Sequence, residues 1–271
     1  MARSAFPRTR TRNGTRTGAR TRVVGVVGVV AALVVTASAC SSAGDDKDPE
    51  HRSFALQGRT LTVDSNDSGL DIVAADSNKS GRIEVTRWFS GSVTFGKDPK
   101  VTWSMKDDRL KLRVKCSGVV ADCSAKHRIE VPRGVSVVVR NGDGSVTAHG
   151  FDQALDIRSG DGSVTVKDST GPLKLSTDDG SIRALGVRSQ RVRAHSQDGS
   201  VRLELASVPD LVESSSDDGS LTIELPRETY RVTADSDDGS VKVSVPRDQH
   251  SSHVVSAKTK DGSIRVRSAG E

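Results

Sequence analysis

The tetrapeptide Asp-Gly-Ser followed by an apolar residue recurs seven times in the C-terminal half of the chain, and this repeat constrains the fold more than any other feature. Successive copies begin 18 to 23 residues apart, at Asp143, Asp161, Asp179, Asp198, Asp218, Asp238 and Asp261. Each copy opens a short segment of alternating apolar and polar residues, which is typical of a half-buried β-strand. Self-similarity at such a period predicts a repeat protein.

A second alternating segment precedes each Asp-Gly, so that every period contains two strands. In one period, SVTV at 163–166 is followed by a turn at 167–171 and by PLKLST at 172–177. We predict an all-β, single-domain β-solenoid of stacked two-strand coils with Asp-Gly-Ser corners. An antiparallel meander with Asp-Gly hairpin turns is the alternative, but identical residues at identical offsets favour the stacking of equivalent coils.

The corner residues have a structural interpretation. Glycine adopts positive φ in a tight corner at no steric cost, and Asp and Ser side chains accept backbone N–H bonds there. The residue after each Ser is expected to point inward, which gives an apolar row of Val146, Val164, Ile182, Val201, Leu221, Val241 and Ile264. A second inward row consists of Ala148, Val166, Ala184, Leu203, Ile223, Val243 and Val266.

The same corners also permit a collective function. Stacked coils would place equivalent carboxylates about 4.8 Å apart, and oxygen-rich sites of this kind suit Ca²⁺. Three Asp doublets occur at the corners, and the last two fall in consecutive periods: Asp178-Asp179, Asp217-Asp218 and Asp237-Asp238. The nonapeptide calcium repeat GGxGxDxUx is not matched, so we assign no metal site and no cofactor, and calcium binding remains a hypothesis.

Outward positions on the strand after each corner carry a partial row of cations, namely Thr147, Thr165, Arg183, Arg202, Thr222, Lys242 and Arg265. Cations beside an acidic row would reduce the repulsion within that row. Alternatively, they would present a stripe to an anionic polymer of the cell wall.

The first forty residues are typical of an export signal. Seven arginines and no acidic residue precede an apolar run at 23–35, which is shorter than the roughly 20 residues of a membrane span. Small residues follow and end at Cys40, as in a bacterial lipobox, except that Ala37 stands where Leu is usual. We predict a lipoprotein-type signal peptide over residues 1–39 and lipidation of Cys40. An ordinary secretory signal and an uncleaved anchor are the alternatives.

The exported part divides into a polar tether at 40–52 and a β-solenoid domain at 53–270. Within the domain, an irregular part at 53–130 is expected to cap the regular repeats at 131–270, because one terminal coil of a solenoid must close the core against water. Residues 67–69 are a candidate degenerate copy of the repeat.

The irregular part contains most of the aromatic residues and two cysteines. The aromatic cluster, Trp88, Phe89, Phe95 and Trp103, is interpreted as packing of the cap, with a sugar-stacking surface as the alternative. We expect Cys116 and Cys123 to form a disulfide in an oxidising compartment, which leaves Cys40 for the lipid.

Charge and motif content argue against several function classes. Removal of the signal with its seven arginines changes the formal net charge from +5 to −2, so the high isoelectric point gives no support for nucleic-acid binding. The G-x-S-x-G, H-E-x-x-H and P-loop motifs do not occur, and the six histidines share no repeat offset. A motif with seven equivalent copies offers no single catalytic place, so we expect no enzyme.

The stretch RIEVPRGVSVVVRNGDGSVTAHG, followed by degenerate repeats behind a lipoprotein signal, resembles the bacterial putative-adhesin family of repeat β-proteins, a domain of unknown function. The resemblance implies a β-solenoid at the cell envelope and supplies no catalytic residues. We expect a lipoprotein at the outer face of the cytoplasmic membrane that acts as a scaffold or adhesin-like surface for a cell-wall polymer or an envelope protein. A carbohydrate-active β-helix enzyme and a Ca²⁺-responsive scaffold are the alternatives.

Overall fold

The computed structural model describes residues 43–75 and 81–270. The chain divides into two compact units, Met1–Ala39 and Cys40–Glu271, and every described residue belongs to the second. The predicted signal segment and Cys40 lie outside the described residues. In the described part of the chain, no helix is long and apolar enough to cross a membrane.

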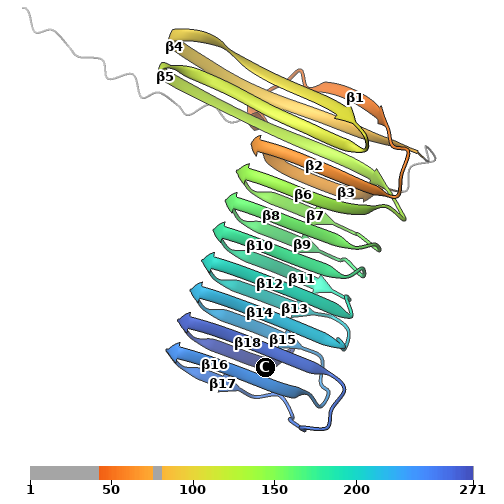
Figure 1. The fold of residues 1–271 in the computed structure, drawn as a ribbon, viewed down its shortest axis with the longest axis vertical. Helices are drawn as coiled ribbons and strands as arrows, with labels where there is room; N and C mark the ends of the chain where they lie inside the picture. The colour runs from red at the N-terminus through yellow and green to blue at the C-terminus, as the bar shows by residue number, and fades with distance from the viewer. Residues whose placement is uncertain (1–42, 76–80, 271) are drawn as a thin grey trace, which may run out of the picture. The chain divides into compact units, whose positions relative to one another are not determined.

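The described part is a solenoid built from two parallel sheets (Figure 1). Each regular coil contributes one strand to each sheet, and an Asp-Gly corner joins the two strands. The first sheet stacks β2 (Thr60–Asp67), β6 (Ser136–Asp143), β8 (Leu155–Asp161), β10 (Leu173–Asp179), β12 (Arg191–Asp198), β14 (Leu211–Asp218), β18 (Val254–Asp261) and β16 (Arg231–Asp238). The second stacks β3 (Gly69–Ala75), β7 (Val146–His149), β9 (Val164–Lys167), β11 (Ile182–Val187), β13 (Val201–Leu205), β15 (Leu221–Leu225), β19 (Ile264–Ser268) and β17 (Val241–Val243).

Parallel pairing in register confirms the predicted solenoid and excludes the meander. The two predicted inward rows form one continuous core together with inward residues of the first sheet. Val241 and Val243 depart from this pattern, and Val241 is 43% exposed. Their coil is the last of the stack, so no further coil covers it.

The other end of the stack is covered by two long antiparallel strands, β4 (Arg82–Lys106) and β5 (Arg109–Pro132). The first residues of β5 pair with β2, and its last residues pair with β3. Between these paired parts, β4 and β5 leave the stack together, extend beyond the corner and return (Figure 1). We call residues 88–101 and 115–126 the corner extension.

Ordered structure begins earlier than the predicted tether allows. A 3₁₀ turn, η1 (Ala43–Asp45), lies against β4 and β5. It is followed by β1 (Glu50–Ala55), which pairs antiparallel with β4. The polar composition of residues 40–52 wrongly suggested a tether without ordered structure. Ala43 is buried, and the exposed residues of β1 are ordered by backbone hydrogen bonds to the edge of β4.

The aromatic cluster divides between two environments. Trp103 is buried in the end coil, where Arg52 and Arg87 lie 4.8 Å and 4.5 Å from its ring centroid and Phe54 packs edge-on. This part of the cluster forms a cap, as predicted. Phe95 is 84% exposed in the corner extension, so the cap interpretation is wrong for that residue.

The order of coils in the stack differs from their order in the sequence. β18 pairs with β14 on one side and with β16 on the other, so the last coil of the chain lies between the two coils that precede it (Figure 1). The 244–253 segment provides the chain length for this crossing. The expectation that the last two Asp doublets occupy neighbouring coils is therefore wrong.

Electrostatics gives a physical reason for this order. The register places Lys260 between Asp217 and Asp237, and the Lys260 ammonium lies 2.9 Å from Oδ2 of Asp217. Stacking in sequence order would instead bring the two Asp doublets into direct contact. The hydrogen bond and charge of Lys260 lower the pKa of Asp217, whereas direct stacking would raise it.

Candidate functional site

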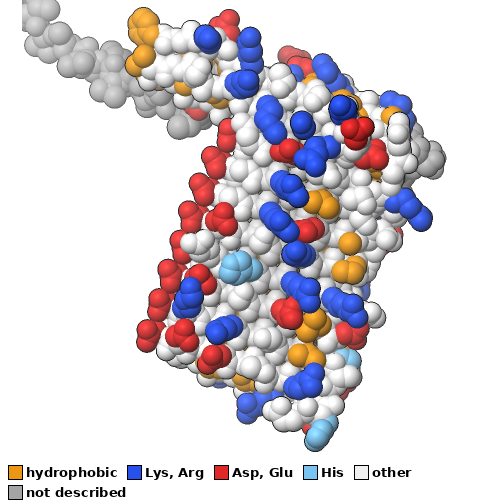
Figure 2. Space-filling model, in the orientation of Figure 1, with side chains coloured by type: hydrophobic (Ala, Val, Ile, Leu, Met, Phe, Trp, Pro, Cys, Tyr) orange, Lys and Arg blue, Asp and Glu red, His pale blue; other side chains and the backbone are white. Residues whose placement is uncertain are grey.

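The corner carboxylates form one row along an edge of the solenoid, seen in red in Figure 2. We call this row the acidic ridge, and in stacking order it consists of Asp67, Asp143, Asp161, Asp179, Asp198, Asp218, Asp261 and Asp238. Asp67 pairs with Asp143, so residues 67–69 occupy the position of a corner. The ridge thus contains all seven corner residues singled out in the sequence and one more.

Partial desolvation and neighbouring carboxylates raise the pKa of three members of the ridge, Asp67, Asp198 and Asp261. The pKa of Asp198 is raised by partial desolvation, then by a hydrogen bond and charge from Asp179. The pKa of Asp261 is raised in the same way, with Asp218 as its main partner. The ridge is therefore a row of closely spaced carboxylates along one edge of the solenoid.

The corner Asp side chains do not satisfy the backbone, contrary to our expectation. Within residues 43–75 and 81–270, none of them accepts a hydrogen bond from a backbone N–H. Instead, the side chain two residues before a corner Asp donates a hydrogen bond to the backbone carbonyl oxygen of a corner glycine or of a glycine next to the corner. Thr177 donates to the carbonyl oxygens of Gly160 and Gly162 at 3.0 and 3.1 Å. Equivalent donors in other coils are Asn141, Ser196, Ser216, Thr259 and Ser236. A Ser, Thr or Asn two residues before each Asp is the sequence signal that our reasoning missed.

Corner glycines are required mainly by close approach between coils. Only Gly144 and Gly262 of the seven have positive φ. At Gly180, a Cβ atom would lie 2.5 Å from the carbonyl oxygen of Gly162, and contacts of the same kind occur at the other stacked corners. The expected left-handed conformation is therefore the exception, and the repeat keeps glycine because any side chain would separate the coils.

The ridge does not present a built metal site in the described residues. No group of three or more His, Cys, Asp or Glu side chains there has an arrangement that could hold a metal ion. The calcium hypothesis rests only on the spacing of the carboxylates.

The outer face of the first sheet carries a denser row of cations than the sequence reasoning identified, visible in blue in Figure 2. We call it the basic face, and its members are Lys111, Arg140, Arg158, Lys174, Arg191, Arg193 and Lys258. The register places Arg140 directly beside Arg158, and Lys174 beside Arg193. These residues come from segments without a shared repeat offset, so only the stacking of coils reveals that they form a row.

Two carboxylates neutralise part of the basic face. Asp156 lies 3.7 Å from Arg158 and 3.9 Å from Lys174, and Glu213 pairs with Arg193. Arg140 and Arg191 make no ion pair with any described residue. The face therefore retains exposed guanidinium groups that are available to an external anion.

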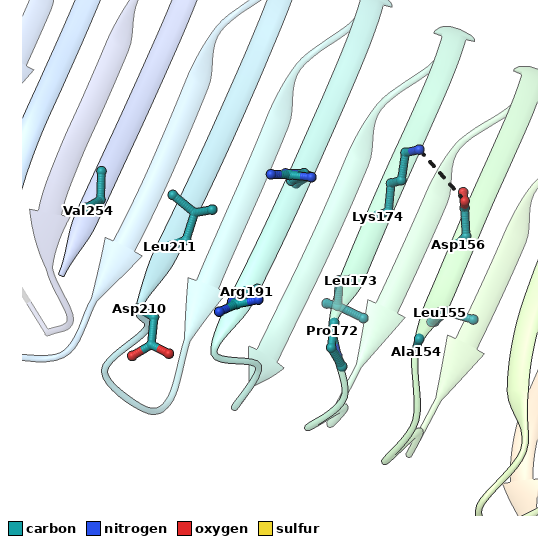
Figure 3. Close-up of a pocket in the computed structure, with 11 residues that line it drawn as sticks. Ala154, Leu155, Asp156, Pro172, Leu173, Lys174, Arg191, Asp210, Leu211 and Val254 are labelled. Atoms are coloured by element: carbon teal, nitrogen blue, oxygen red, sulfur yellow. Dashed lines mark ion pairs between the residues drawn. The ribbon is translucent and has the colours of Figure 1, made fainter. Parts of the chain in front are cut away.

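A shallow hollow of about 520 Å³ lies within the basic face (Figure 3). At the strand starts, small or apolar residues lie on both sides of Arg191, with Ala154 and Pro172 toward one end and Leu211 and Val254 toward the other. Lys174, Arg191 and Arg193 line it together with two carboxylates, Asp156 and Asp210. Such a surface can accept a ligand that combines a negative charge with an apolar or ring-shaped part.

The cation row predicted on the second sheet serves a different purpose from the one expected. Arg202 pairs with Glu204 at 2.6 Å and with Glu224 at 3.0 Å, both on the same sheet. No ion pair joins this row to the acidic ridge in the described part of the chain. Lys260 of the first sheet instead pairs with Asp217, the residue next to Asp218 of the ridge.

The histidines occupy unrelated environments. His127 is fully buried in the end coil, both of its ring nitrogens lack a hydrogen-bond partner, and desolvation followed by the charge of Arg87 lowers its pKa to about 4. His149 contacts Asp168 at 3.0 Å, and His195 contacts Ser215 at 2.9 Å. Cys116 and Cys123 are joined by a disulfide bond in the corner extension.

Comparison with known proteins identifies the family. The family model described as Toastrack DUF4097 matches residues 38–269. The chain belongs to this family. The match confirms the expected relationship to repeat β-proteins of unknown function, and the Toastrack fold is the two-sheet solenoid described above. No match is found among curated proteins.

Solved structures with a similar fold come from bacteria. One from Bacteroides fragilis, described as a putative adhesin, has 16% sequence identity and a TM-score of 0.50 over 82% of this chain and 98% of its own. One from Clostridium sporogenes, described as a putative cell adhesion protein, has 14% identity and a TM-score of 0.38 over 82% of this chain and 100% of its own. At these identities the likeness concerns the fold alone.

Proposed function

We propose that this Toastrack chain is an exported, lipid-anchored scaffold whose basic face binds an anionic polymer of the bacterial cell envelope. In this proposal the protein is an adhesin-like binding surface and not an enzyme. The similar structure from Bacteroides fragilis is described as a putative adhesin, which supports this class of function. The signal sequence and Cys40 support export and anchoring.

The observation that carries the proposal is the row of cations on the basic face. Adjacent strands of the sheet are about 4.8 Å apart, so a chain with regularly spaced phosphates or carboxylates would reach cations from several coils at once. Arginine binds both groups with two parallel hydrogen bonds. Several weak contacts along one polymer add up to useful affinity without a deep pocket.

The test is a pull-down of the exported chain with a purified phosphate-bearing wall polymer at low and at moderate salt. The variant Arg140→Ala/Arg158→Ala/Arg191→Ala should bind about tenfold more weakly, because it removes several contacts that act together. The matched control is Arg183→Ala/Lys242→Ala/Arg265→Ala on the second sheet, which should bind like the wild type. Failure of the wild type to bind at low salt, or equal losses in both variants, would refute the proposal.

Three further experiments address the anchoring and the alternatives. Cys40→Ala should release the protein into the medium, and continued membrane association of that variant would contradict lipidation. Turnover of a wall polysaccharide by the purified protein would favour the enzyme alternative. A melting temperature that is unchanged by millimolar Ca²⁺ or by a chelator would exclude the Ca²⁺-responsive scaffold.

A further inference from the structure

The corner extension is the one place where the described coils depart strongly from the compact corner. In the regular coils the residues Asp-Gly-Ser connect the two sheets. In β5 the same connection takes residues 115–125, and β4 follows it in antiparallel pairing over the whole distance. The two strands therefore form a double layer that extends past the acidic ridge and folds back on itself (Figure 1).

The outer end of the corner extension exposes large apolar side chains. Phe95 is 84% exposed, Val119 is 81% exposed and Val120 is 63% exposed. They lie side by side, because Thr94 pairs with Val120 and the residue pair after it is Gly96 with Gly118. We call these three residues the apolar tip. Large apolar side chains gathered at the end of a projecting element indicate an interaction site.

The apolar tip is held in a fixed shape. The disulfide between Cys116 and Cys123 joins the outgoing and returning limbs of β5 just behind it, with the two Cα atoms 6.1 Å apart. The fold at the tip requires glycine, because a Cβ atom on Gly96 would collide with the backbone at Ser117 and Gly118. A fixed apolar tip keeps its side chains exposed and cannot bury them by local rearrangement.

The start of the described chain is packed at the base of the same extension. The backbone N–H of Phe89 donates to Oδ2 of Asp46 at 3.0 Å, and Ala43 is buried there. Ser41 and Ser42 separate Cys40 from Ala43, so the chain places Cys40 at most about 11 Å from Ala43. The six residue steps from Phe89 to Phe95 span about 20 Å in strand conformation. A lipid on Cys40 would thus keep the apolar tip within reach of the bilayer surface.

The residues around the apolar tip suit a lipid bilayer with anionic head groups. Lys97, Lys100 and Lys115 are exposed beside it, as are Asp98 and Asp122, so the lysines there exceed the carboxylates by one. Apolar side chains flanked by lysines are typical of elements that lie in the membrane interface, with the lysines at the level of the head groups. A second copy of this chain offers no comparable match, because two such tips would bring their lysines together.

We propose that the apolar tip inserts into the surface of an anionic lipid bilayer and forms a second membrane contact beside the lipid on Cys40. This inference rests on the export and anchoring in the proposed function, but not on polymer binding by the basic face. Two contacts would fix the orientation of the solenoid relative to the membrane, whereas a single lipid leaves it free to rotate.

The experiment uses the unit Cys40–Glu271, which contains the whole described core, with Cys40→Ser so that no lipid contributes. Flotation with vesicles of phosphatidylcholine and phosphatidylglycerol should recover the protein, and vesicles of phosphatidylcholine alone should recover less. Phe95→Ser/Val119→Ser/Val120→Ser should reduce binding to anionic vesicles about tenfold, because it removes the apolar area that enters the bilayer. The control is Val241→Ser, which changes an exposed valine at the other end of the stack.

A second readout places the contact at the tip itself. Phe95→Trp should show a blue shift of its added fluorescence when anionic vesicles are present. The inference would be overturned if the wild type did not bind anionic vesicles or if the triple Ser variant bound them equally well. It would also be overturned if the triple Ser substitution abolished a dimer of the protein and left vesicle binding unchanged. The triple Ser variant should still bind the wall polymer, so failure of this inference and failure of the proposed function are distinguishable.

Discussion

Replacement of Gly180 by alanine tests whether close approach of glycines sets the spacing of the coils. A Cβ atom at this position would lie 2.5 Å from the Gly162 carbonyl oxygen and 3.1 Å from Oγ1 of Thr177. Ordinary contact needs at least 3.4 Å, so the two coils must separate by about 1 Å at the corner, and overpacking of this kind costs about 1–3 kcal/mol. Gly180 does not have positive φ, so backbone strain does not contribute.

The separation would also weaken hydrogen bonds between the two coils. The backbone N–H of Gly162 donates to the backbone carbonyl oxygen of Asp179 at 3.0 Å, and that of Val164 donates to the backbone carbonyl oxygen of Ser181 at 2.9 Å. Each such bond contributes about 1 kcal/mol, so the combined loss should be about 2–4 kcal/mol. The assay is the free energy of unfolding from urea denaturation, with Gly69→Ala as the control, because its Cβ atom would meet only Ala125 at 3.9 Å. A Gly180→Ala variant as stable as the control would refute the close-approach argument.

Three more perturbations test the described interactions. Thr177→Val should lower the free energy of unfolding by about 1–2 kcal/mol, because it removes the donor to two glycine carbonyl oxygens; an equal loss in Thr165→Val, on the outer face, would contradict this role. Burial lowers the pKa of His127 to about 4, so its contribution to stability is complete above about pH 6.5 and is lost as the pH falls toward 4. His127→Leu should remove up to about 3 kcal/mol of that pH dependence, and a dependence that persists in the variant would assign it to other groups. Partial desolvation, followed by the hydrogen bond and charge of Asp179, raises the pKa of Asp198 from its usual 3.8. Its contribution to stability is therefore complete below about pH 3.8 and is lost as the pH rises through the raised pKa. Asp198→Asn should raise the melting temperature at neutral pH and have no effect in acid, and a lowered melting temperature at neutral pH would be inconsistent with a repulsive ridge.

The coil architecture could be predicted from the sequence because its cause is local and repeated. A corner that tolerates only glycine between two alternating segments produces the same inward rows in every coil. The rows that begin at Val146 and Ala148 are accordingly buried through the stack as far as its last coil.

Features that depend on which coils are neighbours could not be predicted in the same way. Every corner carries the same tetrapeptide, so its spacing does not reveal that Lys260 comes to lie beside Asp217. The basic face arises because Arg140 and Arg158 share a register position, although nothing in their local sequence marks them as a pair. The corner extension could not be predicted within the irregular part at 53–130, because alternation of apolar and polar residues alone does not show where a strand leaves the stack.

The order of the last coils also decides which strand edge the protein leaves open. A parallel stack with identical corners is a template to which a strand of another molecule can add, and repeated addition would produce a fibre. Because the chain crosses back, the open edge is β16, with Asp235 and Asp237 among its outward residues, and not β18 with Lys258 and Lys260. A second β16 that added in parallel register would place these carboxylates against their own copies. The crossing thus gives the solenoid a terminus that disfavours its own polymerisation.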